Sequence, residues 1–485
     1  MLGLQDWIAA EARYAATRMS AAISATDLVI ERTGFGQRVA PRAGSVLASP
    51  VAAHYDPDPD YFFHWFRDAA IIIDALRVAL AAGYADRSAV LRLQEFVQFN
   101  VSLQSLDGRA FLRASDFRAR VQPLFLQYLR SDAEIAALSG HALLADTRVN
   151  ADGTLDFIRW SRPQTDGPSM RCLALLRWWR QFPELQEERT LRTQMTELIA
   201  ADLDFTLAYV REPCGDVWEE IAGFHYYTQL LHSEALRCGA EWLEDVQQHD
   251  RAAAGRSAAR ETLARLDEFW HERAGYYRSG TSNEPGDRRS ELDISVVLGV
   301  LHAGRMSGRH SVLDPRAQAT LTALEELFES HYAINRERPP EHGPALGRYA
   351  QDRYYSGGAW YLATLAAAEF YFRLASVLRG GAQMIRVAEN NRFRQRLGAA
   401  ESTVDAEELA GLAVERGDAI MRTVRAFTPP GGELSEQFDQ TTGAQTSAKH
   451  LSWSYAAFIT AAASRTQACL PIRAADPGVS AAGRA

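Results

Sequence analysis

Gly215-Asp216-Val217-Trp218-Glu219-Glu220-Ile221-Ala222-Gly223 places two adjacent carboxylates inside an apolar and aromatic run. The apolar neighbours, including Val217, Ile221 and Phe224, predict that the pair is partly buried at the start of a helix. Adjacent glutamates on a solvated helix are common and have no functional meaning by themselves. Burial and a like-charge neighbour both disfavour ionisation, and a general acid at neutral pH needs that property. The stretch therefore suggests a catalytic carboxyl, and this hypothesis needs support from other segments of the chain.

Outward from this stretch, apolar residues recur at helical spacing through most of the chain. The pattern predicts helices near residues 4–24, 67–82, 87–103, 168–181, 187–209, 218–238, 254–272, 290–304, 315–332, 357–377, 404–426 and 451–464. Strand-like alternation is nearly absent, and glycine and proline stand mainly between the helices. No short repeat indicates a solenoid. About twelve helices with one set of polar, aromatic loops predict an all-α fold in which helix pairs close into a ring.

The domain organisation is predicted to be simple. No tether rich in Ser, Thr and Pro divides the chain, so we expect a single domain over residues 1–470. The last stretch, residues 471–485, has the composition of a disordered tail.

Composition limits the classes of partner. The chain has 485 residues, of which 47% are hydrophobic and 23% charged, as in soluble globular proteins. Its net charge of -9 and its scattered Lys and Arg argue against binding to nucleic acid or anionic lipid. No segment is expected to reach the apolar length of a membrane span, and no signal peptide is visible. Four cysteines without a CxxC pair fit a reducing compartment. We expect a cytoplasmic protein, or a secreted one only if an export signal has been removed.

Five segments share one composition, in which Trp or Tyr stands beside Arg, Asp, Glu or Gln. They are residues 61–68, residues 160–168, the stretch 215–223, residues 347–360, and residues 432–439 with Ser447 and 453–455. Any one of them has a structural explanation, such as a helix-start ion pair or a core aromatic. Together they are typical of a sugar site, where aromatic faces stack on the ring and polar side chains bind its hydroxyls. No phosphate loop or HExxH pair is present, so neither a metal nor an organic cofactor is expected.

In chain order, these motifs resemble the glucoamylase family, glycoside hydrolase family 15. The resemblance rests on Gly-Ser-Val-Leu-Ala-Ser-Pro at 44–50, Trp-x-Arg-Asp, Arg-Pro-Gln-x-Asp-Gly-Pro, Asp-x-Trp-Glu-Glu, Gly-Arg-Tyr-x-x-Asp and Ser-Glu-Gln-Phe-Asp. It extends from Leu4 to Ala457 and implies an (α/α)6 barrel as the catalytic domain. It also implies an exo-acting, inverting hydrolase that releases β-D-glucose from the non-reducing ends of α-1,4-linked glucans or maltooligosaccharides. We expect a monomer that needs no cofactor.

The resemblance assigns roles to individual residues. Glu219 matches the general acid and Glu436 the general base, and in an inverting enzyme the two carboxyl groups lie about 6.5–9.5 Å apart. The positions that match substrate-binding groups are Tyr61, Trp65, Arg67, Asp68, Trp160, Arg162, Gln164, Trp218, Glu220, Arg348, Asp352, Trp360 and Ser447. Among these, Tyr61 and Ser447 match groups that orient the base and its water.

Two alternatives stay open at this point. One is a glucan-binding or regulatory protein on the same barrel that has lost catalysis. The other is a family member that acts on trehalose or α-1,6-linked glucan, because Ser161 and Ala222 depart from the family's usual residues. The presence of both carboxylates with Arg67, Asp68 and Arg348 favours an enzyme. Glucose release from maltose, maltoheptaose, isomaltose and trehalose distinguishes the substrates.

Overall fold

Six helices form a closed ring in the computed structural model, which describes residues 2–53, 57–281, 291–400, 402 and 404–470. Each packs against the next in chain order, and the last packs against the first. These inner helices are α2 (Phe66–Ala81), α7 (Asp166–Gln181), α9 (Tyr226–Asp245), α11 (Ser295–Ala303), α14 (Tyr361–Arg379) and α17 (Ser452–Ala468).

Six further helices cover the outside of this ring and alternate with the inner ones along the chain. α3 packs on α2 and α8, α8 on α7, α10 on α9, α12 on α11, α16 on α14, and α1 on α17. Their bounds are α1 (Leu4–Ala21), α3 (Ser88–Leu103), α8 (Arg189–Tyr209), α10 (His249–Arg265), α12 (Pro315–His331) and α16 (Ala406–Phe427). This is an (α/α)6 barrel, so the predicted ring of helix pairs is confirmed.

Most residues of the inner helices are buried because other helices surround them, as in α9, α11 and α14. The extreme case is α14, which is long and apolar enough by length and composition to cross a membrane. The expectation that no segment reaches this apolar length was therefore wrong. In the described fold 89% of that window is buried, as is usual for a core helix of a soluble protein.

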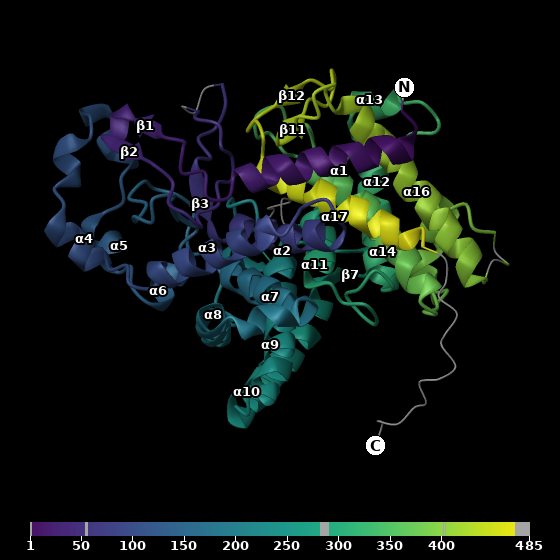
Figure 1. The fold of residues 1–485 in the computed structure, drawn as a ribbon. Helices are drawn as coiled ribbons and strands as arrows, with labels where there is room; N and C mark the ends of the chain where they lie inside the picture. The colour runs from purple at the N-terminus through teal and green to yellow at the C-terminus, as the bar shows by residue number, and fades with distance from the viewer. Residues whose placement is uncertain (1, 54–56, 282–290, 401, 403, 471–485) are drawn as a thin grey trace.

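Short helices and strands make the connections. The short α-helices are α4 (Gly108–Ala114), α5 (Asp132–Ala136), α6 (His141–Leu144), α13 (Ala333–Arg336) and α15 (Asn391–Arg396). The 3-10 helices are η1 (Thr33–Phe35), η2 (Phe117–Arg120), η3 (Pro123–Tyr128), η4 (Pro183–Glu187), η5 (Leu266–Phe269) and η7 (Ala388–Asn390). In Figure 1, α4 to α6 lie with β1 and β2 beside the barrel.

All the strands are short and pair antiparallel, as β1-β2, β3-β4, β5-β6-β9, β7-β8 and β10-β11-β12. Their bounds are β1 (Ile30–Arg32), β2 (Gln37–Val39), β3 (Phe63–Trp65), β4 (Arg148–Asn150), β5 (Cys214–Gly215), β6 (Ala222–His225), β7 (Trp270–His271), β8 (Tyr276–Tyr277), β9 (Gly280–Thr281), β10 (Ala359–Trp360), β11 (Gln437–Phe438) and β12 (Gln445–Thr446). β3, β6 and β10 each lead directly into an inner helix, so they fix where α2, α9 and α14 begin.

Three predicted segment boundaries need comment. The helix expected at 218–238 begins only at Tyr226, because residues 216–221 form a turn and β6 follows it. The helix expected at 254–272 lies at 249–265 and ends in η5. The helix expected at 290–304 is α11 at Ser295–Ala303, while position 290 and the tail 471–485 lie outside the described residues.

The direction of the inner helices creates two different ends of the barrel. Since an outer helix returns the chain between successive inner helices, the inner helices run parallel. Their first turns meet at one end, here called the N-terminal mouth, and their last turns meet at the other, the C-terminal mouth.

Candidate active site

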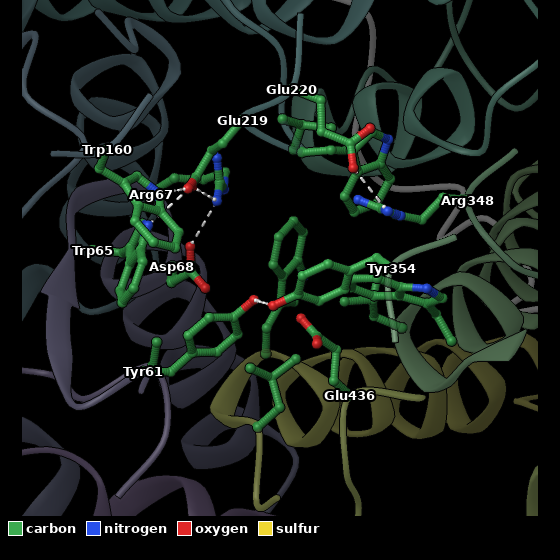
Figure 2. A pocket seen from close by; sticks show the side chains of 17 residues that line it. Tyr61, Trp65, Arg67, Asp68, Trp160, Glu219, Glu220, Arg348, Tyr354 and Glu436 are labelled. Carbon is green, nitrogen blue, oxygen red and sulfur yellow. Dashed lines mark hydrogen bonds and ion pairs between the residues drawn. The ribbon is translucent and has the colours of Figure 1, made fainter. Parts of the chain in front are cut away.

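A cavity of about 240 Å³ lies at the N-terminal mouth (Figure 2). Its wall consists of residues in the first turns of inner helices and in the loops that precede them. These are Ala48, Tyr61, Trp65, Arg67, Asp68, Trp160, Val217, Trp218, Glu219, Glu220, Arg348, Tyr354, Trp360, Leu362, Glu436, Leu451 and Trp453. Eleven of the fifteen residues predicted from the sequence are on this wall.

The other four predicted residues lie outside the wall. Gln164 accepts a hydrogen bond from Arg67 Nη1 at 3.2 Å, Asp352 pairs with Arg348, and Ser447 donates to Glu436. Among the described residues, Arg162 forms no ion pair with a residue of the wall, and instead pairs with Asp146 and Asp156. The first three therefore orient wall residues, whereas Arg162 holds the shape of its own loop.

Glu219 sits at the end of a tight turn, with a backbone φ of 67°. Left-handed conformations are uncommon for residues other than glycine and cluster at functional sites. The turn is held by Asp216, whose carboxylate accepts hydrogen bonds from the backbone N–H groups of Glu220 at 2.6 Å and Ile221 at 3.0 Å. The Asp216 side chain thereby fixes the direction in which Glu219 points into the cavity.

Three donors surround the Glu219 carboxylate. Trp65 Nε1 donates to Oε1 at 2.9 Å, Arg67 Nη2 donates to the same oxygen at 3.0 Å, and Trp160 Nε1 donates to Oε2. The side chain is 11% exposed, so this carboxylate is held rigidly but remains open to the cavity.

Glu220 points to a different side of the cavity from Glu219 (Figure 2). Its Oε1 lies 2.9 Å from Arg348 Nη2, and its Oε2 accepts a hydrogen bond from the Tyr349 hydroxyl. The two adjacent glutamates thus contact different arginines and do not form the carboxyl pair that their adjacency suggested.

Arg67, in the first turn of α2, is surrounded by several carboxylates. It lies 3.2 Å from Asp68 and 3.5 Å from Asp166, in addition to its contact with Glu219. Burial raises the pKa of Asp68 to about 6, Arg67 opposes that rise, and the negative charges of Glu219 and Asp166 add to it. A buried cluster of this kind suits the hydroxyls of a neutral ligand, which can both donate and accept hydrogen bonds.

Arg348 is oriented by Asp352 through two hydrogen bonds, of 2.7 Å and 2.6 Å. Its guanidinium lies over the rings of Trp218 at 5.4 Å and Trp360 at 4.9 Å. Trp360 Nε1 also donates to Asp352 at 3.3 Å. This part of the wall therefore combines flat aromatic faces with fixed polar donors, as expected of a sugar site.

Glu436 occupies the loop before β11, across the cavity from Glu219 (Figure 2). It is only 4% exposed, and Ser447 Oγ donates to its Oε2. Burial raises the pKa of Glu436 to about 7, and the Ser447 hydrogen bond opposes the rise. The hydroxyls of Tyr61 and Tyr354 meet at 2.7 Å, and burial raises the pKa of both, with the charge of Glu436 adding to the rise.

Sequence reasoning did not select every residue of the site. Tyr354 and Trp453 belong to quoted aromatic segments, yet only the fold shows that they reach the wall. Asp166 also lies in a quoted loop, and its contact with Arg67 depends on the packing of α7 against α2. Asp293 accepts a hydrogen bond from Trp218 Nε1 at 2.9 Å and has no sequence signal of its own.

In the part of the chain that the structure describes, no group of three or more His, Cys, Asp and Glu side chains could hold a metal ion. The absence of a cofactor stays a prediction. Cys172, Cys214 and Cys238 are buried free thiols, and Cys469 is an exposed one.

Replacing Ser447 with alanine should shift the pH dependence of activity. The Ser447 hydrogen bond favours the ionised form of Glu436, so its loss raises the pKa of that carboxyl further. A hydrogen bond to a charged group contributes roughly 1.5–3 kcal/mol, or about one pKa unit or more. If Glu436 must be ionised to act, the ascending limb of kcat/KM moves to higher pH by that amount. Profiles of wild type and Ser447→Ala measure it, and Ser435→Ala is the control, because the Ser435 hydroxyl donates to the Gln437 carbonyl and not to Glu436 in the described structure. An unmoved limb would rule out this role of Ser447.

Known proteins match both the sequence and the fold. The family model for glycosyl hydrolases family 15 matches residues 145–463. The chain is 28% identical to Glucoamylase-1 of Schizophyllum commune, in an alignment that covers 86% of this chain and 68% of the relative. It is 26% identical to Glucoamylase 1 of Rhizopus oryzae, over 86% of the chain and 67% of the relative. Its structure is similar to the family 15 glucoamylase of Hypocrea jecorina, with a TM-score of 0.78, 26% identity, and coverage of 96% of this chain and 72% of that one.

Proposed function

Because the chain belongs to glycosyl hydrolase family 15, we propose that it is an exo-acting, inverting glucan 1,4-α-glucosidase that releases β-D-glucose. One observation carries this proposal: two carboxylates, Glu219 and Glu436, face one compact aromatic cavity from opposite sides (Figure 2). A pocket at the mouth of a barrel accommodates a chain end, and its polar groups can bind the hydroxyls of a terminal sugar.

In the proposed reaction, Glu219 donates a proton to the glycosidic oxygen as the C1–O bond breaks. Glu436 takes a proton from a water molecule whose oxygen forms the new bond to C1 on the opposite face. Each turnover consumes one water and gives β-D-glucose and a shortened glucan. Glu436 leaves the step protonated and Glu219 deprotonated, and exchange with solvent restores both.

The remaining wall residues have binding and positioning roles in this proposal. Arg67 and Asp68 bind hydroxyls of the terminal glucose, and Arg348 does so from the other side with Glu220. The hydroxyl pair of Tyr61 and Tyr354 adjoins Glu436 and would hold the attacking water. Positioning of this kind lowers the barrier because the reacting atoms need no further search for orientation.

Charge and cysteine content bear on the substrate and the location. The net charge of -9 supports a neutral glucan or maltooligosaccharide as substrate, and no nucleic acid or membrane partner. The free cysteines support a cytoplasmic location, and we propose a monomer. The regulatory alternative is disfavoured because both carboxylates are retained on one cavity wall. Trehalose and isomaltose, tested beside maltose and maltoheptaose, decide the linkage.

The anomeric configuration of the first product tests the proposal. If Glu436 activates water, an α-linked substrate must give β-glucose first. If a carboxylate attacked C1 directly, two displacements would give α-glucose, and the two carboxyls would lie only about 5–5.5 Å apart. Proton NMR of maltoheptaose hydrolysis in the first minutes, before mutarotation mixes the anomers, measures this. Initial α-glucose would overturn the assignment of Glu436 as the base. Absence of any glucose would overturn the proposal that the protein is a glucan hydrolase.

A further inference from the structure

The C-terminal mouth of the barrel also contains open space. Two cavities, of about 380 Å³ and 600 Å³, adjoin there and share the wall residues Arg77, Val78, Gly304 and Arg373. Their walls come from the middle and last turns of inner helices, whereas the cavity of Glu219 is lined by first turns and the loops before them. The space therefore lies at the opposite end of the barrel from the proposed catalytic site.

The walls of these cavities are cationic. They contain six arginines and two carboxylates, in a protein whose net charge is -9. The carboxylates are Asp74 and Glu234. The arginines, here called the arginine ring, are Arg77, Arg177, Arg180, Arg237, Arg305 and Arg373.

The first carboxylate cannot balance the arginines that it touches. Asp74 Oδ1 lies 2.7 Å from Arg77 Nε, and its Oδ2 lies 2.5 Å from Arg177 Nη1. Burial acts to raise the pKa of Asp74, but the two arginines outweigh it and lower that pKa to about 2, so Asp74 is ionised at neutral pH. Two guanidinium groups on one carboxylate leave one positive charge in excess.

The second carboxylate shows the same imbalance. Glu234 contacts Arg237 at 2.5 Å and Arg305 at 2.8 Å. Glu241 contacts Arg237 at 2.5 Å and Arg180 at 2.9 Å. Three guanidinium groups on two carboxylates again leave one positive charge in excess.

Arg373 adds no further excess, because its Nη2 pairs with Glu369 at 2.5 Å. The local charge of the arginine ring with its four carboxylates is therefore close to +2.

Capping of helix ends explains only part of this arrangement. Carbonyl groups at helix C-termini attract cations, and Arg177 Nη2 donates to the carbonyls of His302 and Ala303 at 2.6 Å and 3.0 Å. Arg373 Nη1 likewise donates to the Leu301 carbonyl at 2.6 Å. Arg77 and Arg305 differ, since each uses Nε and Nη1 for its contacts with described residues. Nη2 of Arg77 and of Arg305 therefore has no hydrogen-bond partner among the described residues, and it can donate to a ligand.

We propose that the C-terminal mouth binds a phosphate dianion, either orthophosphate or the phosphate group of a small phosphorylated sugar. Guanidinium groups bind phosphate through paired, charge-assisted hydrogen bonds, and a dianion matches the excess charge of the arginine ring. The cavity volumes lie in the range of small-molecule sites, so a sugar attached to the phosphate also fits. This inference does not depend on the proposed hydrolase activity.

Calorimetric titration of the full-length protein with sodium phosphate at pH 7.5 tests the site, against sodium chloride at equal ionic strength. We expect saturable binding of one phosphate and a melting temperature that rises with phosphate concentration. A second arm uses glucose 6-phosphate, and tighter binding than orthophosphate would show that the sugar is also recognised. Equal or weaker binding would assign the site to orthophosphate.

Arg305→Gln and Arg77→Gln should each lower phosphate affinity by about tenfold, the loss expected for one charge-assisted hydrogen bond. Arg211→Gln is the matched control, because this exposed arginine pairs with Glu261 on the outside of the barrel. Circular dichroism confirms that each variant is folded, and two separate arginines keep the test valid if one variant fails to fold. Wild-type binding no stronger than the chloride control, or equal binding in wild type and both variants, would overturn the proposal.

Discussion

Glu219→Gln is expected to lower kcat by about 10²–10⁴-fold, the usual contribution of general acid catalysis. The amide keeps the shape of the side chain but has no proton to give to the glycosidic oxygen. It also has a single acceptor oxygen, which can satisfy Trp65 and Arg67 but not Trp160 at the same time. We therefore expect a small change in glucan affinity beside the large loss of turnover. Steady-state kinetics with maltoheptaose, and glucan binding followed by tryptophan fluorescence, separate the two effects.

Glu220→Gln is the matched comparison, because it changes the neighbouring residue in the same way. Glu220 contacts Arg348 and Tyr349 and has no contact with Trp65 or Trp160 in the described structure. Its loss should weaken substrate binding as well as rate, and so raise KM. If Glu220→Gln instead left KM unchanged and abolished turnover, while Glu219→Gln stayed active, the two roles would have to be exchanged.

The barrel could be predicted from sequence because helical periodicity is a local property. Each inner helix carries a long apolar pattern, and glycine or proline marks most of the loops between helices. What the pattern misplaced was the stretch around Glu219, which was expected to begin a helix. Trp218 and Glu219 are compatible with a helix by composition, but the side chain of Asp216 binds two backbone N–H groups and stabilises a turn. A side-chain contact of this kind competes with helix formation and is not visible in hydrophobic spacing.

The site could be predicted only in part, for a related reason. Segments that combine aromatic and polar residues indicated where wall residues lie, and the resemblance assigned their roles. Neither could show that Arg162 pairs with Asp146 and Asp156 instead of a residue of the cavity wall. The arginine ring was missed altogether, because its members are scattered from Arg77 to Arg373 and appeared to form no basic stripe. Only closure of the ring of helices brings them to one mouth.

Glu436→Gln is expected to abolish most turnover and, at the same time, to stabilise the protein at high pH. As the proposed base, Glu436 must accept a proton from water, and an amide cannot, so kcat should fall by about 10²–10⁴-fold. Loss of turnover alone would not separate a base from a general structural defect. Stability at high pH separates the two explanations, because a structural defect would lower it whereas loss of a buried carboxylate should raise it.

The effect on stability follows from burial. In the folded protein the pKa of Glu436 is about 7, raised from an ordinary value of 4.5. A raised carboxyl pKa means that folding favours the neutral form, so the contribution of Glu436 to stability is complete below pH 4.5 and is lost as pH rises through 7. The shift of about 2.5 units corresponds to roughly 3 kcal/mol. Glutamine is neutral at every pH and does not incur this loss.

Relative to wild type, Glu436→Gln should therefore gain up to roughly 3 kcal/mol of unfolding free energy between pH 4.5 and pH 8. Urea denaturation of both proteins at the two pH values measures the change, and the exposed Glu337→Gln is the control. A variant that is inactive and equally destabilised at both pH values would show that Glu436 is a structural residue rather than a buried base. A variant that is inactive yet more stable than wild type at pH 8, and equally stable at pH 4.5, would show a carboxyl that the fold keeps buried at a cost to stability, as a water-activating base in this cavity requires.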